Sequence, residues 1–494
     1  MKWKRLAAVL LTLTLTMSIG TTALATGVDT TNTEELTQEE KDELYKQELE
    51  KIYNDPVQSN DWTNWPEGPG TYGEAAIIMD AGTGAILYAK NINDKHYPAS
   101  ITKVLTALVA VENGQLSDTV NITADCVNFL QPGDSSIALK KGNVITLEEC
   151  LYATLLASAN EAAYAVGENV GKNAGYDYNW FIEQMNTRMK ELGGTNSNFT
   201  NTNGLHDENH YTTVHDMALV GKEIFKHQEL LDIMQTKQYI IEESDTVEEH
   251  VFQQKHKMLQ PAYKAYYKYA VGGKTGYTSD ALNTLITMAD NGEQQLVCVV
   301  MREQSGKSYP DTTALFEYAF KNFNRVNVAD FETSEDVGEV LTDQGGGYVT
   351  LPEGVDTSSL EMEFIPDEGT IGEATLNYTY EGELVGTARV KLSDAYIEAH
   401  TAKIEAVTDE EAEEKEEKEE EPDTFIGKLM KKVMDNFRNM SMTEKIILAA
   451  ACVVLVVLVI LFIRGIAIRA GRKRRGKQSG KENSKKSRHR KGKK

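Results

Sequence analysis

Residues 75–88 have the sequence Ala75-Ala76-Ile77-Ile78-Met79-Asp80-Ala81-Gly82-Thr83-Gly84-Ala85-Ile86-Leu87-Tyr88. The two stretches 75–79 and 85–88 are apolar and strand-like, whereas the five residues between them are typical of a turn. A β-hairpin is therefore predicted where the folded part of the chain begins.

Helical patterns follow this hairpin, and strand patterns return after them. Apolar residues recur at helical spacing in 101–111, 147–170 and 180–192. Strand patterns at 284–288 and 296–301 flank a turn at Asn291-Gly292, and a last helix is expected at 312–323. Strands at both ends of a helical centre predict an α+β domain over residues 72–325, with an antiparallel sheet flanked by helices.

A second folded segment is expected after this domain. Residues 327–400 are rich in Gly, Thr and Val, with short alternating runs such as 348–351 and 388–392. This pattern predicts a small all-β domain, and it contains no catalytic constellation.

The N-terminus has the features of a secretory signal peptide, predicted to span residues 1–25. Lys2, Lys4 and Arg5 precede an apolar run, and Ala23-Leu24-Ala25 forms a cleavage site of the Ala-X-Ala type. Residues 26–71 begin with an acidic stretch that predicts a solvated, partly helical leader without chemistry.

The C-terminal region predicts a membrane anchor. Residues 446–463 are 18 uncharged, apolar residues, enough to cross a bilayer core as a helix. Residues 401–423 are an acidic linker, and 424–445 fit an amphipathic juxtamembrane helix or, equally, a plain extension of the span. The basic tail, 464–494, is expected in the cytoplasm, with the catalytic domain on the outer face of the cytoplasmic membrane.

The overall composition excludes several classes of protein. The formal net charge is -24, with 75 acidic against 51 basic residues, so most of the chain would repel nucleic acid. The hydrophobic content of 41% is too high for wholesale disorder. Three cysteines, Cys126, Cys150 and Cys298, lie in the predicted exported part, so at most one pair of them can form a disulfide.

The first candidate catalytic element is Ser100-Ile101-Thr102-Lys103, at the start of a predicted helix. Residues three apart on a helix share a face, so the lysine lies near the serine hydroxyl. A serine becomes a useful nucleophile when a base takes its proton, and a lysine of lowered pKa is such a base. Alone, the motif also fits an ordinary helix start with a surface lysine.

The second element is Ser158-Ala159-Asn160, where small polar residues interrupt an apolar helical run. Ser158 could relay a proton, and Asn160 could hold a substrate carbonyl. A helix that merely tolerates small polar residues is the alternative.

The third element is Lys274-Thr275-Gly276-Tyr277, preceded by two further glycines and predicted to form an edge strand. Lys274 offers a positive charge and Thr275 a hydroxyl to a substrate carboxylate. A phosphate-binding loop would need a glycine at position 268, which is occupied by Lys268, so that interpretation fails.

The three elements together, in this order, are characteristic of penicillin-binding proteins and class A β-lactamases. The chain resembles the low-molecular-mass penicillin-binding proteins that are serine-type D-alanyl-D-alanine carboxypeptidases. The resemblance covers about residues 74–325 and includes 76–80, 201–205 and 210–218. It implies a penicillin-binding, transpeptidase-like fold with a helical subdomain, and the β-rich segment is similar in position to the family's second domain.

The resemblance also implies the roles of the site residues. Ser100 would be the acylated nucleophile, Lys103 its base, Ser158 a proton relay, and Asn160 the group that orients Lys103 and the substrate. Lys274 and Thr275 of the Lys274-Thr275-Gly276 motif would grip the terminal carboxylate. The N–H groups of Ser100 and Tyr277 would form the oxyanion hole. The substrate would be a peptidoglycan stem pentapeptide, β-lactams would acylate Ser100, and no metal or cofactor is implied.

The sequence departs from the family pattern at the rim of the site. Asp280-Ala281-Leu282-Asn283 stands where Ala-Gly is usual, His256 stands where Asn is frequent, and Glu161 replaces a common Asp. These departures leave the implied mechanism intact and put the rim of the site in question.

Other functions remain as alternatives. A class A β-lactamase would have Ser-Asp-Asn and a Glu-X-X-Leu-Asn stretch, which this chain lacks between Asn160 and Lys274. A D,D-endopeptidase or transpeptidase would use the same residues, and a non-catalytic wall- or β-lactam-binding membrane protein is a third possibility. The stretch from His206 to His210 has two histidines four apart, but Asn203-Gly204 before it favours a polar loop over a zinc site.

Overall fold

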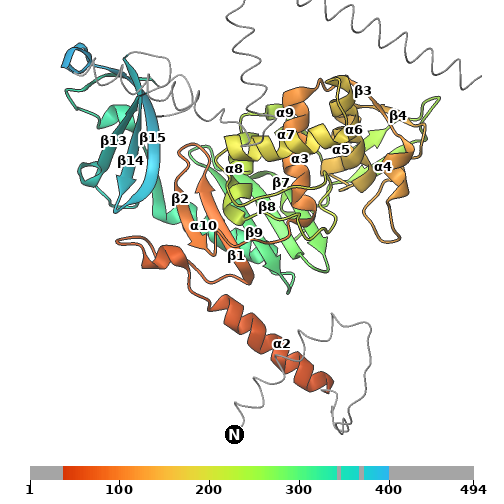
Figure 1. The fold of residues 1–494 in the computed structure, drawn as a ribbon. Coiled ribbons are helices and arrows are strands. Elements are labelled where there is room, and N and C mark those ends of the chain that lie inside the picture. Colours follow the sequence, from red (N-terminus) through yellow and green to blue (C-terminus); the bar gives the residue numbers. More distant parts are fainter. Residues whose placement is uncertain (1–36, 342–346, 367–371, 400–494) are drawn as a thin grey trace, which may run out of the picture. The chain divides into compact units, whose positions relative to one another are not determined.

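The computed structural model describes residues 37–341, 347–366 and 372–399 (Figure 1). In these ranges no helix is long and apolar enough to cross a membrane. The predicted signal peptide, acidic linker, juxtamembrane helix, span 446–463 and basic tail all lie outside them.

A five-stranded antiparallel sheet forms the centre of the first domain, with strand order β2-β1-β9-β8-β7. Its strands come from both ends of the domain: β1 (Gly73–Asp80), β2 (Ile86–Lys90), β7 (Ala270–Thr278), β8 (Leu282–Asp290) and β9 (Gln295–Glu303). The predicted hairpin and the returning strands are confirmed, with bounds shifted by one to a few residues.

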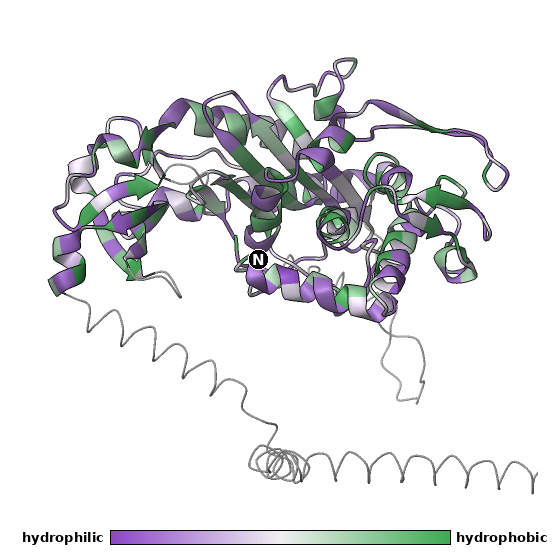
Figure 2. Ribbon diagram, turned by 90° about the horizontal axis from the view of Figure 1, so that it is seen from above, coloured by the Kyte–Doolittle hydropathy of each residue, from purple (hydrophilic) through white to green (hydrophobic). Residues whose placement is uncertain are grey.

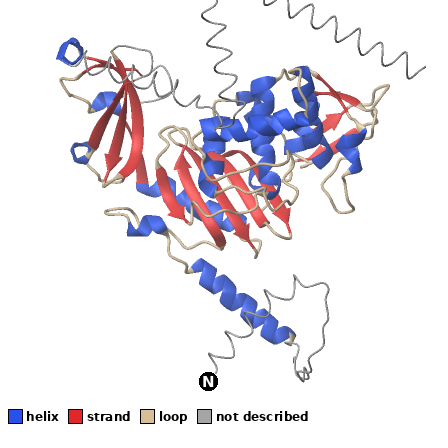
Figure 3. Cartoon of the chain, viewed as in Figure 1, coloured by secondary structure: helices blue, strands red, loops and turns tan. Residues whose placement is uncertain are grey.

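Helices cover this sheet on both faces. Six consecutive residues of β9, 296–301, are buried, and both α8 (Val214–Ile224) and α10 (Ser308–Asn322) pack against that strand. Hydrophobic residues are dense along the central strands and their covering helices (Figure 2). The layered arrangement of strands and helices is the predicted α+β architecture (Figure 3).

The residues between β2 and β7 form a mainly helical subdomain with two short hairpins. The helices are α3 (Thr102–Asn113), α4 (Ala124–Asn128), α5 (Leu147–Leu155), α6 (Asn160–Asn173), α7 (Tyr178–Glu191) and α9 (Gln228–Gln235). The hairpins pair β3 (Thr119–Asn121) with β4 (Val144–Thr146), and β5 (Gln238–Ile241) with β6 (His250–Gln253).

The single helix predicted over 147–170 is wrong, because the structure divides it into α5 and α6. The backbone between the two helices turns at Ser158, whose φ is 61°. A non-glycine residue rarely adopts this left-handed conformation, and such strain is often found at functional sites. The helical pattern did not reveal the break, because the apolar spacing continues from 155–157 before it to 162–163 after it.

The small β domain is a six-stranded antiparallel sheet with the order β10-β12-β15-β14-β13, in which β11 also pairs with β15. Its strands are β10 (Phe323–Asn327), β11 (Val337–Leu341), β12 (Tyr348–Pro352), β13 (Glu361–Pro366), β14 (Glu373–Tyr380) and β15 (Glu383–Leu392). The first of them follows α10 directly and begins inside the range predicted for the preceding domain.

Buried hydrogen bonds join the two sheets. Asp80, at the end of β1, accepts a hydrogen bond from Thr350 Oγ1 of β12 at 2.9 Å. The same carboxylate accepts the backbone N–H groups of Gly82 and Thr83, and the Thr83 and Thr350 hydroxyls lie 3.1 Å apart. One carboxylate thus holds the hairpin turn and the β domain together.

The end of the predicted leader is part of the fold, which corrects the expectation of a fully solvated segment. Helix α2 (Gln38–Tyr53) is hydrophilic along most of its length, but Ile52 near its end is buried. The buried ammonium of Lys90 donates to the carbonyl of Ile52 at 2.6 Å and to that of Thr71 at 2.9 Å. Trp65 is also buried, and its indole N–H donates to Leu87 O.

The three cysteines in the described ranges, Cys126, Cys150 and Cys298, are free and buried. The pairing left open by the sequence is therefore not used in this structure.

Candidate active site

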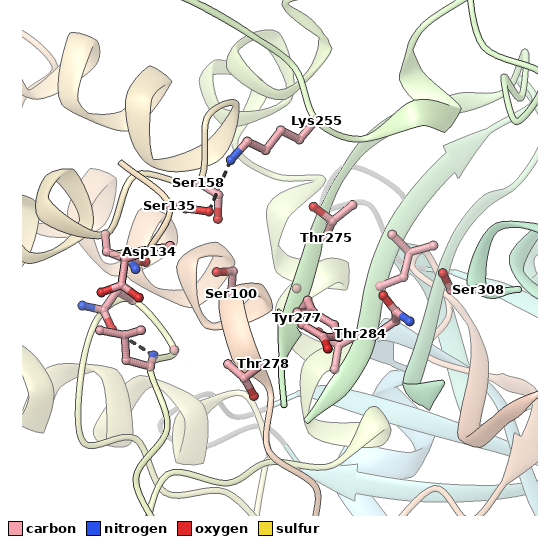
Figure 4. Close-up of a pocket in the computed structure, with 18 of the residues that line it drawn as sticks. Ser100, Asp134, Ser135, Ser158, Lys255, Thr275, Tyr277, Thr278, Thr284 and Ser308 are labelled. Carbon is pink, nitrogen blue, oxygen red and sulfur yellow. Dashed lines mark hydrogen bonds between the residues drawn. The ribbon is translucent and has the colours of Figure 1, made fainter. Parts of the chain in front are cut away.

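The structure brings residues of all three motifs to one cavity of about 660 Å³ between the helical subdomain and strand β7. Ser100 lies between Ser158 on the helical side and Thr275 and Tyr277 on the strand (Figure 4). Asn160 and Gly276 line the same cavity, whereas Lys103 and Lys274 are buried behind its surface.

Ser100 lies on a strained turn. Ser100 is the middle residue of a short 3-10 helix, Ala99–Ile101, that precedes α3, and Ala99 has a left-handed φ of 49°. Gly204 (φ 81°) packs so closely on this turn that a Cβ at that position would collide with the carbonyl of Ala99. The α-helix expected from Ser100 therefore begins at Thr102, with the half-buried serine just ahead of it.

Lys103 lies in hydrogen-bond contact with Ser100. Its Nζ lies 2.9 Å from Ser100 Oγ and donates to Asn160 Oδ1 at 2.8 Å and to Asn203 O at 2.5 Å. Burial, reinforced by the positive charges of Lys274 and Lys255, holds the pKa of Lys103 well below its usual range. A neutral amine in hydrogen-bond contact with a serine hydroxyl can remove its proton.

Asn203 is a functional residue that the sequence motifs did not reveal. Its backbone carbonyl accepts a hydrogen bond from Lys103 Nζ, as does Asn160 Oδ1, and a neutral amine that donates to both keeps its lone pair for the Ser100 hydroxyl. The side chain of Asn201 orders this loop by accepting the N–H of Gly204 at 2.7 Å. Any residue type can supply a backbone carbonyl, so residue identity alone could not predict this contact. The family resemblance of residues 201–205 was the one feature of the sequence that pointed to this loop.

Asn160 is held at the start of α6, where its backbone N–H donates to Ser135 O at 2.8 Å. The next residue, Glu161, is fully buried and accepts hydrogen bonds from Ser136 Oγ (2.6 Å) and Ile137 N (2.8 Å). The longer side chain at this departure from the family pattern therefore fixes the loop that forms one wall of the cavity.

Strand β7 supplies the opposite wall. A Cβ at Gly276 would lie 2.8 Å from the backbone nitrogen of Ser100, so only glycine lets the strand approach the nucleophile. Thr284 on the neighbouring strand donates to Pro98 O at 2.8 Å and ties the sheet to the turn. Ser100 and Tyr277, whose N–H groups the resemblance assigns to the oxyanion hole, both line the cavity.

Lys274 lies deeper than the sequence motif suggested. Its side chain is 1% exposed, and Nζ donates to Thr275 O at 2.7 Å. Burial and the nearby charge of Lys255 lower the pKa of Lys274 to about 7. Thr275 is the member of this motif whose side chain faces the cavity in Figure 4.

The stretch 206–210, with its two histidines, is a loop, as predicted. His210 is buried, its Nδ1 accepts the N–H of Thr200 at 3.0 Å, and its Nε2 lies 2.9 Å from Thr102 Oγ1. Both ring nitrogens are therefore occupied within the protein.

Another group in the described part of the chain has suitable spacing for a cation, namely Glu112, Glu223 and His227. The guanidinium of Arg188 already donates to Glu112 at 2.8 Å and to Glu223 at 2.9 Å. This cluster is a structural ion-pair network, and none of its members lines the cavity.

Comparisons with known proteins agree with the geometry of the site. Residues 64–305 match a family model described as D-alanyl-D-alanine carboxypeptidase. The chain is 30% identical over 261 residues to the D-alanyl-D-alanine carboxypeptidase DacB2 of Mycobacterium tuberculosis, covering 52% of this chain and 84% of that one. It is 30% identical over 257 residues to DacF of Bacillus subtilis, covering 51% of this chain and 62% of that relative.

A solved structure, that of a DD-transpeptidase from Streptomyces, is 25% identical, with a TM-score of 0.48 and coverage of 52% of this chain and 100% of that one. The family model spans the three motifs, whose residues meet at the cavity that contains Ser100. The chain therefore belongs to the D-alanyl-D-alanine carboxypeptidases, the serine-type penicillin-binding proteins of low molecular mass.

Proposed function

We propose that the protein removes the terminal D-Ala from peptidoglycan stem pentapeptides through an acyl-enzyme on Ser100. The observation that carries this proposal is the contact between Lys103 Nζ and Ser100 Oγ, made by a buried lysine of lowered pKa inside the cavity. Family membership supports the reaction type, and β-lactams would acylate the same serine.

The chemistry follows from the arrangement. Neutral Lys103 takes the proton of Ser100 as Oγ attacks the carbonyl carbon of the penultimate D-Ala. The N–H groups of Ser100 and Tyr277 stabilise the oxyanion, and the substrate carboxylate lies toward Thr275 and the charge of Lys274. The proton passes through Ser158 to the departing D-Ala amine. Water then attacks the acyl-enzyme by the same route and frees the tetrapeptide.

The decisive experiment compares the full-length wild type with Ser100→Ala. Each is incubated with a pentapeptide ending in D-Ala-D-Ala and with a cross-linked muropeptide, and free D-alanine and product masses are measured. Serine-dependent release of one D-Ala from the pentapeptide is the expected result. Cleavage of the cross-linked substrate alone would make the protein a D,D-endopeptidase, and penicillin labelling of Ser100 without turnover would make it a binding protein.

The cellular location that we propose rests on the sequence. The apolar run 446–463 followed by 15 basic residues and one acid in 464–494 favours a C-terminal anchor in the cytoplasmic membrane. The signal-peptide features of 1–25 favour a catalytic domain on the outer side of that membrane. Protease treatment of intact protoplasts should remove the catalytic domain and leave the basic tail protected, and protection of the whole protein would contradict this topology.

A further inference from the structure

The stretch from His250 to Ser279 has a charge balance opposite to that of the whole chain. Its 30 residues contain five lysines and no aspartate or glutamate, whereas the chain carries 75 acidic and 51 basic residues. One of these lysines is Lys274 of the third motif. The others are Lys255, Lys257, Lys264 and Lys268.

Two of these lysines, Lys255 and Lys257, face the active-site cavity. Lys255 lies in the extended segment that follows strand β6, and Lys257 is the first residue of the short 3-10 helix Lys257–Leu259. Both are exposed, whereas His256 between them and Met258 after them are buried. The alternation therefore places two ammonium groups along one edge of the cavity that contains Ser100.

Neither ammonium is neutralised by the groups that it contacts. Lys255 Nζ donates to the hydroxyl of Ser135 at 3.3 Å, as Figure 4 shows. Lys257 Nζ lies 5.8 Å from the ring centroid of Tyr263 and 6.0 Å from that of Tyr309, and these rings carry no net charge. Of the described side chains that line the cavity, Asp134 is the one acid against these two lysines.

We propose that Lys257, together with Lys255, binds a second carboxylate that the substrate carries upstream of its D-Ala-D-Ala end. This inference rests on the proposed function, in which the terminal carboxylate already lies toward Thr275 and Lys274. Two further cations along the same cavity match a peptide with an additional acidic group. The ring of Tyr309, which lines the cavity, offers an apolar face to the aliphatic atoms next to that group.

Lys257 is the better of the two lysines to substitute, because its removal should affect binding without changing the pKa of the catalytic lysines. The charge of Lys255 acts on the pKa of both Lys103 and Lys274, so its removal would change the catalytic groups. Lys257 is not among the charges that shift either pKa. Lys264 belongs to the same basic stretch but does not line the cavity, and Lys264→Met is therefore the matched control.

The experiment measures kcat and KM for the full-length wild type, Lys257→Met and Lys264→Met. Two pentapeptides are compared that differ only in whether the upstream acidic residue carries a free carboxylate or its amide. A short diacylated peptide ending in D-Ala-D-Ala, with no second carboxylate, serves as the reference substrate. We expect the wild type and Lys264→Met to prefer the carboxylate peptide by about threefold to tenfold in kcat/KM. Lys257→Met should lose this preference through KM, with kcat unchanged.

The inference would be overturned if the wild type had equal kcat/KM for the carboxylate and amide peptides. It would also be overturned if Lys257→Met lowered kcat/KM by the same factor for the two peptides. Either result leaves the proposed function intact as long as the short reference peptide is hydrolysed in a Ser100-dependent way. Failure to hydrolyse any of the three peptides would instead refute the proposed function itself.

Discussion

The imidazole of His210 and the hydroxyl of Thr102 are joined by a buried hydrogen bond of 2.9 Å. Because His210 Nδ1 accepts the N–H of Thr200, the ring proton lies on Nε2 and is donated to Thr102 Oγ1. That hydroxyl in turn donates to the carbonyl of Ala99 at 2.9 Å. The chain of contacts ends on the strained residue directly before the nucleophile, so His210 is a positioning residue for Ser100.

Replacing His210 with Ala should slow acylation of Ser100 and lower stability by about 1–3 kcal/mol, because buried partners lose their hydrogen bonds. The rate of labelling by a fluorescent penicillin and the urea unfolding curve measure the two effects. If His210 acts through Thr102, the double variant with Thr102→Val should acylate no more slowly than the slower single variant. Strictly additive losses would contradict this pathway.

Two lysines should shape the pH dependence of kcat/KM. Lys103 acts as a base in its neutral form, and burial with neighbouring cations lowers its pKa, so activity should rise with pH on an acid limb well below pH 10. Lys274 attracts the substrate carboxylate in its charged form. Its pKa of about 7 predicts that KM increases as pH rises through that value.

Substitution of Lys255 should move both limbs in the same direction. Its positive charge lowers the pKa of Lys103 and of Lys274, so Lys255→Met should shift the acid and the alkaline limb to higher pH. Profiles of kcat/KM measured between pH 5 and 10 test this shift. Lys264→Met provides the control, in which the acid and alkaline limbs should both stay in place, because Lys264 does not line the cavity. Unmoved limbs in Lys255→Met would argue against electrostatic coupling.

His256 should make the fold sensitive to acid. Burial, reinforced by the charge of Lys274, lowers the pKa of this fully enclosed imidazole to about 3. The unfolded chain therefore binds more protons than the folded chain between about pH 6.5 and 3, and stability falls as pH decreases through this window.

The variant His256→Asn tests this effect with a side chain that can still donate to Thr287 Oγ1, as His256 Nε2 is placed to do at 2.9 Å. Relative to wild type, we expect it to retain about 2–3 kcal/mol more of its stability between pH 6.5 and 4.5. Urea unfolding at several pH values measures the difference. His210, whose pKa is also lowered to about 3, should preserve part of the slope, and parallel curves would show that His256 does not contribute.

The glycine of the third motif should be intolerant of any side chain. A Cβ at Gly276 would press on the backbone of Ser100, whereas a Cβ at Gly272 on the same strand would meet the ends of the Met288, Leu231 and Met234 side chains. Gly276→Ala should therefore slow penicillin acylation on the order of a hundredfold, the usual cost of a damaged oxyanion hole. Gly272→Ala should acylate within a few-fold of wild type, and equal rates in the two variants would exclude a special role for the close approach.

The sequence predicted the sheet, and the residues that meet at one cavity, better than the local details of the site. Periodicity located the hairpin and the returning strands because each is a local apolar pattern. The turn at Ser158 was missed since its conformation is imposed by packing around the site and leaves no local pattern. The contact between Lys103 and Asn203 joins residues 100 positions apart through a backbone oxygen, which residue identities do not encode.

The hydrogen bond between Asp80 and Thr350 has a consequence for dissecting the molecule. A truncation after α10 would follow the domain boundary that the sequence suggests. It would nevertheless delete β12 and expose the buried carboxylate of Asp80, beside the first hairpin, to solvent. A catalytic domain expressed without the β domain would therefore need a compensating substitution at Asp80. Without it, the hairpin of β1 and β2 would be less stable. The β domain therefore contributes to the stability of the central sheet through Thr350.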